Sequence, residues 1–368
     1  MNMNKKKIVW ITGDSFKDVD MLLVPYLKER ASEFDIKWYI FCGYNSKVEF
    51  DDVKPEKIFR LNKRLRDLSN VSVYKRIFNE IKVKNVDLIY SDHLGLPYYY
   101  PVLSSMVDKK KIIHAAHNVM PYPVWPASLK WYVWYLFHAF NNFQMFSKHT
   151  AKWFGEHYPK KKMFYAPMVV KDFGRVRTDN YVVDDDKVNL LFFGNVVANK
   201  RLDLLIDAVK ALPMDIQKKV HLNICGNCTR MNKQDFIDQI GDCKCISTYF
   251  KRIPDEEIPE LFTKHQFFML PYEDVAQSGP HMIAYNYNLP VIASNIDGFA
   301  ERVEDGKNGF LFEPRNVESL RDAIIKAVEI GKDGYKQMKD NLHKYVEDNF
   351  SLQAVAPKYV EFFNEVMK

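Results

Sequence analysis

Three loops in the second half of the chain place glycine and polar residues where an apolar strand pattern ends. They are Gly194-Asn195 leading to Lys200-Arg201, then Cys225-Gly226-Asn227, and then Gln277-Ser278-Gly279. Glycine lets a backbone approach a ligand closely, and the N–H groups at the start of a helix attract anions. A cation beside such a loop could neutralise a diphosphate leaving group as its charge develops. Together the three loops outline one phosphate site.

The last of these loops makes the most specific prediction. Residues 267–270 are an apolar run typical of a buried strand, and a helix is expected from Pro280 to about Tyr287. Ser278 or Gly279 would cap that helix, because proline is tolerated in the first helical turn. The positive end of the helix dipole would then face the mouth of a sheet. An ordinary capped helix of an α/β domain is the alternative.

Basic and imidazole side chains supply the candidate catalytic groups. Lys200 and Arg201 precede a predicted helix, where cations are disfavoured unless something requires them, although a solvated helix start is the alternative. In the first half, His117 ends a predicted strand and suits a polar contact in a cleft. His114 competes with it, and a purely structural histidine is the other interpretation. Glu273 is among the carboxylates close to the last loop.

Length and composition indicate a two-domain globular protein. The chain has 368 residues, of which 47% are apolar and 14% aromatic, so it can bury a sizeable core. Its formal charge of +6 is mild. That charge fits a protein that handles phosphate-bearing or acidic partners, but it is well short of the basicity of a dedicated nucleic-acid binder, so no nucleic-acid partner is expected.

Two features of the chain predict a cytoplasmic location. The apolar run after the three N-terminal lysines, 8–11, is too short for the hydrophobic region of a signal peptide. No apolar stretch reaches the ~18 residues that a spanning helix needs.

The cysteines allow two interpretations. Their number, five, argues against a disulfide framework. Four of them, Cys225, Cys228, Cys243 and Cys245, could supply thiolates to zinc. However, Cys225 closes an apolar strand at a tight turn, and Cys-x-Cys is an unusual second half of such a site. Reduced thiols and no metal are therefore expected.

Strand and helix patterns alternate in two separate runs, which predicts two doubly wound α/β domains with ligand loops at the carboxyl ends of parallel strands. The segment 169–186 lacks apolar periodicity and is interpreted as the interdomain linker. The expected domains are 1–170 and 171–350, facing a cleft, followed by a helix at 351–368. That final helix could cross back to the first domain.

An aromatic-rich helix is expected near 127–141. Its aromatic residues, which include Trp131 and Trp134, lie nearly all round it. Either the helix is buried on most sides, or part of it meets a membrane surface or an apolar acceptor. Basic residues such as Lys63, Arg64 and Arg66 could support attachment to anionic lipid, although solvated charge is the commoner explanation.

An ordered series of motifs in the second half resembles a known family. The motifs are Leu191-Phe-Phe-Gly194 with Lys200, Leu222-Asn-Ile-Cys-Gly226, Phe268-Met-Leu-Pro-Tyr272, Leu289-Pro-Val-Ile-Ala-Ser294 with Glu301, and Asn308-Gly-Phe-Leu-Phe312. They resemble the nucleotide-sugar half of the retaining GT-B glycosyltransferases of family 4, the group 1 glycosyl transferases, over roughly 188–327. The first half resembles the family only loosely, through Gly13, His117 and Ser147.

The resemblance implies a UDP- or GDP-linked sugar as donor, transfer with retention of configuration, and no bound metal or other cofactor. By the same resemblance, Lys200 contacts the donor phosphates and His117 lies near the donor sugar. The implied site has His117 and Lys200 as catalytic residues, and Gly13, Gly194, Asn195, Arg201, Gly226, Glu273, Gln277, Ser278 and Gly279 as donor-binding residues.

The sequence departs from the family pattern in ways that affect the site. The family usually has arginine where Asn195 stands, and its paired glutamates would fall at Val275 and Ile283. The ribose contact is therefore unassigned.

The function expected is a glycosyltransferase that is cytoplasmic or peripheral on the inner face of the membrane. Its acceptor would be a polysaccharide or lipid-linked glycan. The alternatives are a catalytically weak or inactive nucleotide-sugar-binding partner protein and, less well matched, a nucleotide-sugar epimerase.

Overall fold

The chain divides into two compact units. In the computed structural model the described residues are 5–46, 54–64, 66–93, 97–117, 119, 126–181, 183–184, 186–275 and 277–368. Unit 1 comprises Met1–Val169 together with Leu352–Lys368, and unit 2 comprises Val170–Ser351. Within the described residues, each unit is built on one parallel sheet, as the alternating strand and helix patterns predicted.

Unit 1 contains a seven-stranded sheet, as far as the chain is described, with the order β3-β2-β1-β4-β5-β6-β7. Its strands are β1 (Lys6–Gly13), β2 (Phe34–Cys42), β3 (Lys57–Arg60), β4 (Leu88–Asp92), β5 (Ile112–Ala116), β6 (Asn142–Met145) and β7 (Lys162–Tyr165). Its helices are η1 (Asp14–Phe16), α1 (Lys17–Asp20), α2 (Leu23–Arg30), α3 (Asn70–Glu80), η2 (Val83–Asn85), α4 (Tyr99–Met106), η3 (Lys109–Lys111), α5 (Ala127–Ala139), α6 (Lys148–His157) and α15 (Leu352–Val366).

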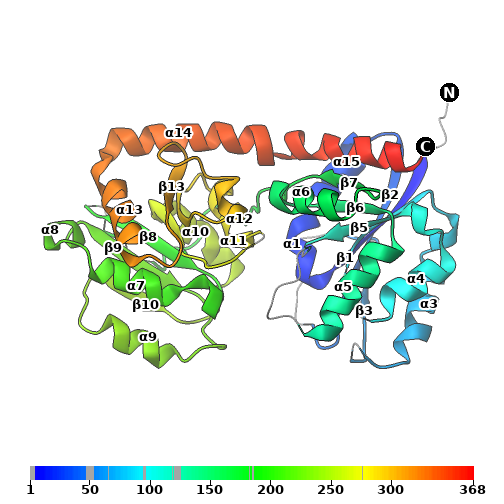
Figure 1. Ribbon diagram of the computed structural model, residues 1–368, viewed down its shortest axis with the longest axis horizontal. Coiled ribbons are helices and arrows are strands. Elements are labelled where there is room, and N and C mark those ends of the chain that lie inside the picture. The colour runs from blue at the N-terminus through cyan, green and yellow to red at the C-terminus, as the bar shows by residue number, and fades with distance from the viewer. Residues whose placement is uncertain are drawn as a thin grey trace. The chain divides into compact units, whose positions relative to one another are not determined.

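Unit 2 contains a sheet of six strands among its described residues, with the order β10-β9-β8-β11-β12-β13 (Figure 1). Its strands are β8 (Val188–Phe193), β9 (Val220–Cys225), β10 (Ile246–Tyr249), β11 (Phe267–Leu270), β12 (Val291–Ser294) and β13 (Gly309–Phe312). Its helices are η4 (Ala198–Lys200), α7 (Leu202–Lys210), α8 (Met214–Gln217), α9 (Lys233–Ile240), η5 (Asp255–Glu257), α10 (Ile258–Lys264), α11 (Gly279–Asn286), α12 (Asp297–Ala300), α13 (Val317–Glu329) and α14 (Gly331–Phe350).

Both sheets are covered on two faces, which explains why their strands are continuous apolar runs. Successive side chains of a strand point to opposite faces. In unit 1, Val9 and Ile11 join the core formed with α3, α4, α5 and α6, whereas Trp10 stacks on Tyr359 of α15. Each sheet reverses its strand order beside its first strand, between β1 and β4 and between β8 and β11. Ligands of doubly wound sheets bind outside the carboxyl ends of strands at such a point.

The C-terminal helix belongs to unit 1, which confirms the prediction that it crosses back to the first domain. α15 packs against α2 and β7. Its Tyr359 hydroxyl accepts a hydrogen bond of 2.6 Å from Gln144 Nε2 on β6, and both side chains are buried. The buried polar pair fixes the position of α15 on the sheet, because leaving either group without a partner would cost free energy.

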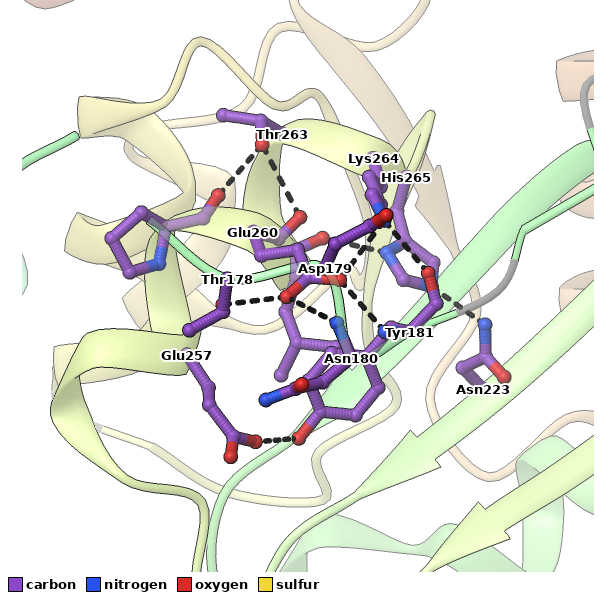
Figure 2. A network of polar contacts seen from close by, with 12 residues as sticks. Thr178, Asp179, Asn180, Tyr181, Asn223, Glu257, Glu260, Thr263, Lys264 and His265 are labelled. Carbon is purple, nitrogen blue, oxygen red and sulfur yellow. Dashed lines mark hydrogen bonds and ion pairs between the residues drawn. The ribbon is translucent and has the colours of Figure 1, made fainter. Parts of the chain in front are cut away.

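The segment interpreted as the interdomain linker is attached to unit 2 by polar contacts. Figure 2 shows its residues around the buried carboxylate of Glu260 on α10. Glu260 accepts hydrogen bonds from Thr178 Oγ1 at 2.6 Å and from the N–H groups of Asn180 and Tyr181 at 3.0 and 2.7 Å. Lys264 Nζ pairs with the same carboxylate at 2.9 Å. Apolar periodicity is missing here because polar contacts, rather than an apolar face, hold the segment in place.

The pKa of Glu260 reflects this network. Burial by itself would raise the pKa, but the hydrogen bonds from Thr178, Asn180, Lys264 and Tyr181 outweigh it and lower the pKa from 4.5 to about 2. A carboxyl whose pKa is lowered by folding stabilises the folded state above its ordinary pKa. That stabilisation is lost as the pH falls from about 4.5 towards about 2.

We predict that Glu260→Gln lowers the free energy of unfolding by about 1–3 kcal/mol at pH 7, because a neutral amide cannot accept all of these bonds. Urea unfolding followed by circular dichroism measures the change. The exposed Glu256 lies one turn earlier, so Glu256→Gln is the matched control and should have little effect. The difference between wild type and Glu260→Gln should shrink below pH 4.5. A pH-independent difference would contradict the electrostatic explanation.

Candidate functional site

Two glycines shape the carboxyl edge of the sheet in unit 2. Gly194 follows β8 with a φ of +110°, and Gly226 follows β9 with a φ of +147°. A methyl group added to Gly226 would lie 2.1 Å from the carbonyl oxygen of Gly194, so only glycine permits this approach of the two backbones. The N–H of Gly194 donates to the carbonyl oxygen of Cys225 at 3.0 Å. The loop after β8 is therefore fixed against the end of β9.

Lys200 directs its ammonium group to this loop. A methyl group on Gly194 would lie 2.8 Å from Lys200 Nζ and 3.7 Å from Pro280 Cγ of α11. The same ammonium lies 5.3 Å from the ring centroid of Tyr272, which follows β11. Gly194, Lys200 and the start of α11 thus meet where the sheet reverses its strand order. The structure thus places the loops around Gly194 and Gly226 and the start of α11 close together, whereas their binding of phosphate stays a prediction.

α11 begins as predicted, with Ser278 as its cap. The Ser278 hydroxyl accepts a hydrogen bond from the N–H of His281 at 3.4 Å, and the Ser278 side chain is buried. An α-helix leaves its first N–H groups without intrahelical partners, and its dipole gives that end a partial positive charge. Gly279 is the first residue of the helix and has no side chain to cover it. The start of such a helix favours an anion.

The other predicted donor-binding residues of unit 2 differ in their partners and in their exposure to solvent. Arg201 adopts a φ of +48° and its guanidinium pairs with Asp203 at 2.9 Å. The hydrogen bond to Asp203 raises the pKa of Arg201. Glu273 pairs with Arg315, Asn195 is exposed, and Gln277 is half-buried beside Ser278. Of the two basic residues that precede α7, Lys200 has its ammonium group beside Gly194, whereas Arg201 has its guanidinium paired with Asp203.

In unit 1, His117 lies at the carboxyl end of β5, where it pairs with the buried carboxyl group of Asp92 of β4. Its Nε2 is 2.6 Å from Asp92 Oδ1. The rings of Phe16 and Phe146 stack on the imidazole with centroid distances of 4.0 and 4.2 Å. Burial raises the pKa of the Asp92 carboxyl well above its usual range. Pairing and stacking together fix the orientation of the imidazole ring.

A cavity of about 90 Å³ adjoins this pair, between α5 and the ends of β4 and β5. Most of its lining is apolar, but Asp92 and His93 line it as well. Asp92 Oδ2 and His93 Nε2 are buried atoms without a hydrogen-bond partner among the described residues. Gly13 leaves room for this arrangement, since a methyl group on it would lie 2.7 Å from His93 Nδ1. The cavity suits a small apolar group that carries one or two polar atoms.

Sequence reasoning missed several residues around His117. It did not single out Asp92, although a polar residue at the end of a buried strand is the usual signal of a site. Phe16 and Phe146 gave no signal, because isolated aromatic residues are common in cores. His114, the competing histidine, is buried and hydrogen-bonded to Tyr100.

The aromatic helix α5 is buried on one side only, and its exposed side carries two tryptophans. Tyr132, Val133, Leu136 and Phe137 are buried, whereas Trp131 and Trp134 are 63% and 52% exposed. Arg66 Nη2 donates to Ser128 Oγ of this helix at 3.4 Å, which brings one predicted basic residue beside it. No helix in the described ranges is both long and apolar enough to cross a bilayer.

The cysteines do not form a four-thiolate cluster in the described residues, where no three potential ligands gather around a metal position. Cys225 is buried at the end of β9, while the sulfurs of Cys243 and Cys245 lie 3.2 Å apart.

Comparison with known proteins finds a likeness to glycosyltransferases within unit 2. Residues 178–345 match the family model described as glycosyl transferases group 1. A relative from Klebsiella pneumoniae, an uncharacterized 41.2 kDa protein in the cps region, is 24% identical over 185 residues. That match covers 49% of this chain and 47% of the relative, so about half of each protein is compared.

Solved structures resemble the whole chain. A glycosyltransferase from Rickettsia africae superposes with a TM-score of 0.76 at 18% identity, covering 100% of both chains. HepE from Anabaena, solved with UDP and glucose, superposes with a TM-score of 0.74 at 14% identity, covering 98% of this chain and 100% of HepE. These likenesses show the GT-B fold. With the family match they support a glycosyltransferase enzyme, and they give no support to an inactive binding partner.

We predict that Gly226→Ala destabilises the protein and displaces the Gly194 loop, because the new methyl group would overlap the Gly194 carbonyl. Gly306 is the control: its φ is +75°, but no atom lies within 4 Å of an added methyl group. Gly306→Ala therefore carries only the conformational cost of a positive φ, about 1 kcal/mol. Thermal unfolding compares the two variants. Equal shifts in Tm for the two variants would show that the Gly194 backbone can move away from the added methyl group.

Proposed function

We propose that the protein is a retaining glycosyltransferase that moves a sugar from UDP or GDP to a polysaccharide or lipid-linked glycan. The observation that carries this proposal is the meeting of Lys200, Gly194 and the start of α11 at the reversal point of the unit 2 sheet. That arrangement presents an ammonium group and a helix N-terminus to one place, which suits a diphosphate.

The chemistry requires the diphosphate to leave with the electron pair of the bond to the anomeric carbon. Negative charge then grows on the phosphate oxygens, and Lys200 stabilises it more strongly in the transition state than in the bound substrate. We propose that Gly194, Ser278 and Gly279 contribute backbone contacts to the same oxygens. Because an ammonium and the end of a helix dipole supply positive charge here, the proposed reaction uses no metal or other cofactor.

We propose that His117 contacts the donor sugar, as the family resemblance implies. A group that touches the reacting sugar must be held in one orientation to be useful. The 2.6 Å hydrogen bond to Asp92 and the two stacked phenylalanine rings supply that restraint. Asp92 is therefore proposed as a positioning residue for His117.

Lys200→Ala should reduce release of UDP or GDP from the nucleotide sugar by about 10²–10³-fold, as is typical when one electrostatic contact to developing charge is removed. A thermal-shift screen of nucleoside diphosphates and their sugars first selects the donor, and nucleotide release is then measured with and without acceptors. Lys219 is exposed and precedes β9 at the opposite edge of the sheet, so Lys219→Gln is the matched control.

Two results would contradict the proposal. If Lys200→Ala released the nucleotide at the wild-type rate, Lys200 would have no role in the reaction. Tight nucleotide-sugar binding without release under any acceptor would instead indicate a binding protein.

We propose further that the enzyme works at the cytoplasmic face of the membrane, with Trp131 and Trp134 at the lipid interface. Tryptophan is favoured at that interface, and a basic residue beside α5 suits anionic headgroups. Changing both tryptophans to alanine should lower binding to anionic vesicles at least tenfold, since burying one large apolar side chain contributes ~1.5–3 kcal/mol.

Sedimentation with vesicles of phosphatidylserine and phosphatidylcholine measures this binding. The control changes Met214 and Ile237 to alanine, because these residues of unit 2 are also exposed, at 67% and 41%. Equal binding by the tryptophan variant and the wild type, or no binding by either, would end the membrane proposal.

A further inference from the structure

The cavity beside His117 contains two buried polar atoms that the proposed reaction does not use. Asp92 ends β4 and His93 follows it, and both residues line the cavity. His117 Nε2 lies against Asp92 Oδ1, which leaves the other carboxyl oxygen, Oδ2, without a hydrogen-bond partner in the described chain. His93 Nε2 also lacks one within those residues. Because a buried polar atom without a partner costs free energy, a ligand that pairs with both atoms is favoured here.

The His93 ring is held in place and carries no charge at neutral pH. It packs against the rings of Tyr99 and Phe41, at centroid distances of 4.8 and 5.7 Å. A methyl group on Gly13 would lie 2.7 Å from His93 Nδ1, so this edge of the ring faces the backbone. Burial lowers the pKa of His93 to about 4. The neutral imidazole has one N–H, and with the proton on Nε2 it can donate one hydrogen bond to a ligand.

The remaining wall and the volume of the cavity limit the size of the ligand group. One side is an apolar wall from α5, formed by Leu129, Val133, Leu136 and Phe137. The volume is about 90 Å³. Sites for whole small molecules usually have about 300–1,000 Å³. The cavity therefore admits one substituent of a sugar rather than the complete sugar.

Four common substituents of sugars can be compared with this cavity. A hydroxyl could pair with both polar atoms but would leave the apolar wall without a contact. The methyl group of a deoxy sugar would contact the wall but leave Asp92 Oδ2 and His93 Nε2 unpaired. A carboxylate would face the Asp92 carboxyl with like charge. An acetamido group has all three features, namely an N–H donor, a carbonyl acceptor and a methyl group.

We propose that the cavity binds the acetamido group of an N-acetylated hexosamine, so that the enzyme selects such a sugar over the corresponding hexose. The amide N–H donates to Asp92 Oδ2, the carbonyl oxygen accepts from His93 Nε2, and the methyl group packs against α5. The inference rests on the proposed function, since it names the substrate class of the same site. Both the donor sugar and the acceptor are sources of this group, and the experiment distinguishes them.

The test measures the preference for an acetamido group over a hydroxyl group in two arms. The donor arm compares the affinities of UDP-N-acetylglucosamine and UDP-glucose, and of the two galactose counterparts, by calorimetry. The acceptor arm compares methyl glycosides of the same N-acetylated and unsubstituted sugars as acceptors, by the kcat/KM of nucleotide release. We expect a preference of at least about tenfold in one arm, because a site with buried hydrogen-bonding groups rejects an analogue that leaves them unpaired.

A cavity-filling variant shows whether this preference arises in the cavity. Val133 lines it and is 7% exposed, so Val133→Phe places a larger side chain there. The preference should fall below about threefold, while the unsubstituted sugar should remain within about threefold of its wild-type value. Val176 is 48% exposed, so Val176→Phe is the matched control and should keep the preference. Thermal unfolding verifies that both variants fold.

His93→Leu tests the polar contact and leaves the α5 wall intact. Removing one neutral hydrogen bond to the acetamido carbonyl should lower the preference by about three- to tenfold. The unsubstituted sugar has no such carbonyl, so its value should stay within about threefold of wild type. This variant also keeps the inference testable if Val133→Phe does not fold.

The outcomes separate this inference from the proposed function. If wild type releases nucleotide but shows no preference in either arm, the cavity holds only water, and the inference is wrong while the proposed function stands. A preference that survives both Val133→Phe and His93→Leu would place the acetamido group elsewhere. Equal losses for the substituted and unsubstituted sugars would leave the cavity with a structural role only. If wild type neither binds nor turns over any nucleotide sugar, the proposed function fails, and the inference fails with it.

Discussion

Burial on both faces is the constraint on which the rest of this structure depends. A parallel strand covered by helices on each side must be apolar along its length, so groups that meet a ligand collect where strands end. Gly13 and Asp92 end two neighbouring strands in unit 1, and Gly194 follows a strand in unit 2. In each sheet these positions lie beside the reversal of strand order, where the connections lead away to opposite sides and leave the edge open.

Close approach and charge build the site in unit 2 on that edge. Gly226 admits the backbone of Gly194, which leaves the turn after β8 open to Lys200. The ion pair between Arg201 and Asp203 decides which of two adjacent basic residues remains available. The two residues are adjacent in the sequence, but the guanidinium of Arg201 already has a carboxylate partner at 2.9 Å, whereas the ammonium of Lys200 lies beside Gly194.

The contrast between the two units is one of environment. In unit 2 the polar groups of the site are half-buried cations and backbone N–H groups, which suit an anion that arrives from solvent. In unit 1, Asp92 and His117 are enclosed by aromatic rings and a mostly apolar cavity. Burial raises the pKa of Asp92 because the charged carboxylate loses its hydration. The pair of Asp92 and His117 fixes the orientation of the imidazole ring, and burying the carboxyl group costs folding free energy.

The sequence by itself determined the local elements. Apolar runs bounded by glycine gave the strands, and Ser278 before Gly279-Pro280 gave the start of α11, because capping and strand burial depend on residues close together in the chain. The tertiary structure alone decided which distant residues meet. His117 finds Asp92 across 25 positions, and Lys171 reaches a glycine more than a hundred residues away. Apolar periodicity cannot predict such contacts. They depend on tertiary packing and on the hydrogen bonds of a polar segment, and not on local propensity.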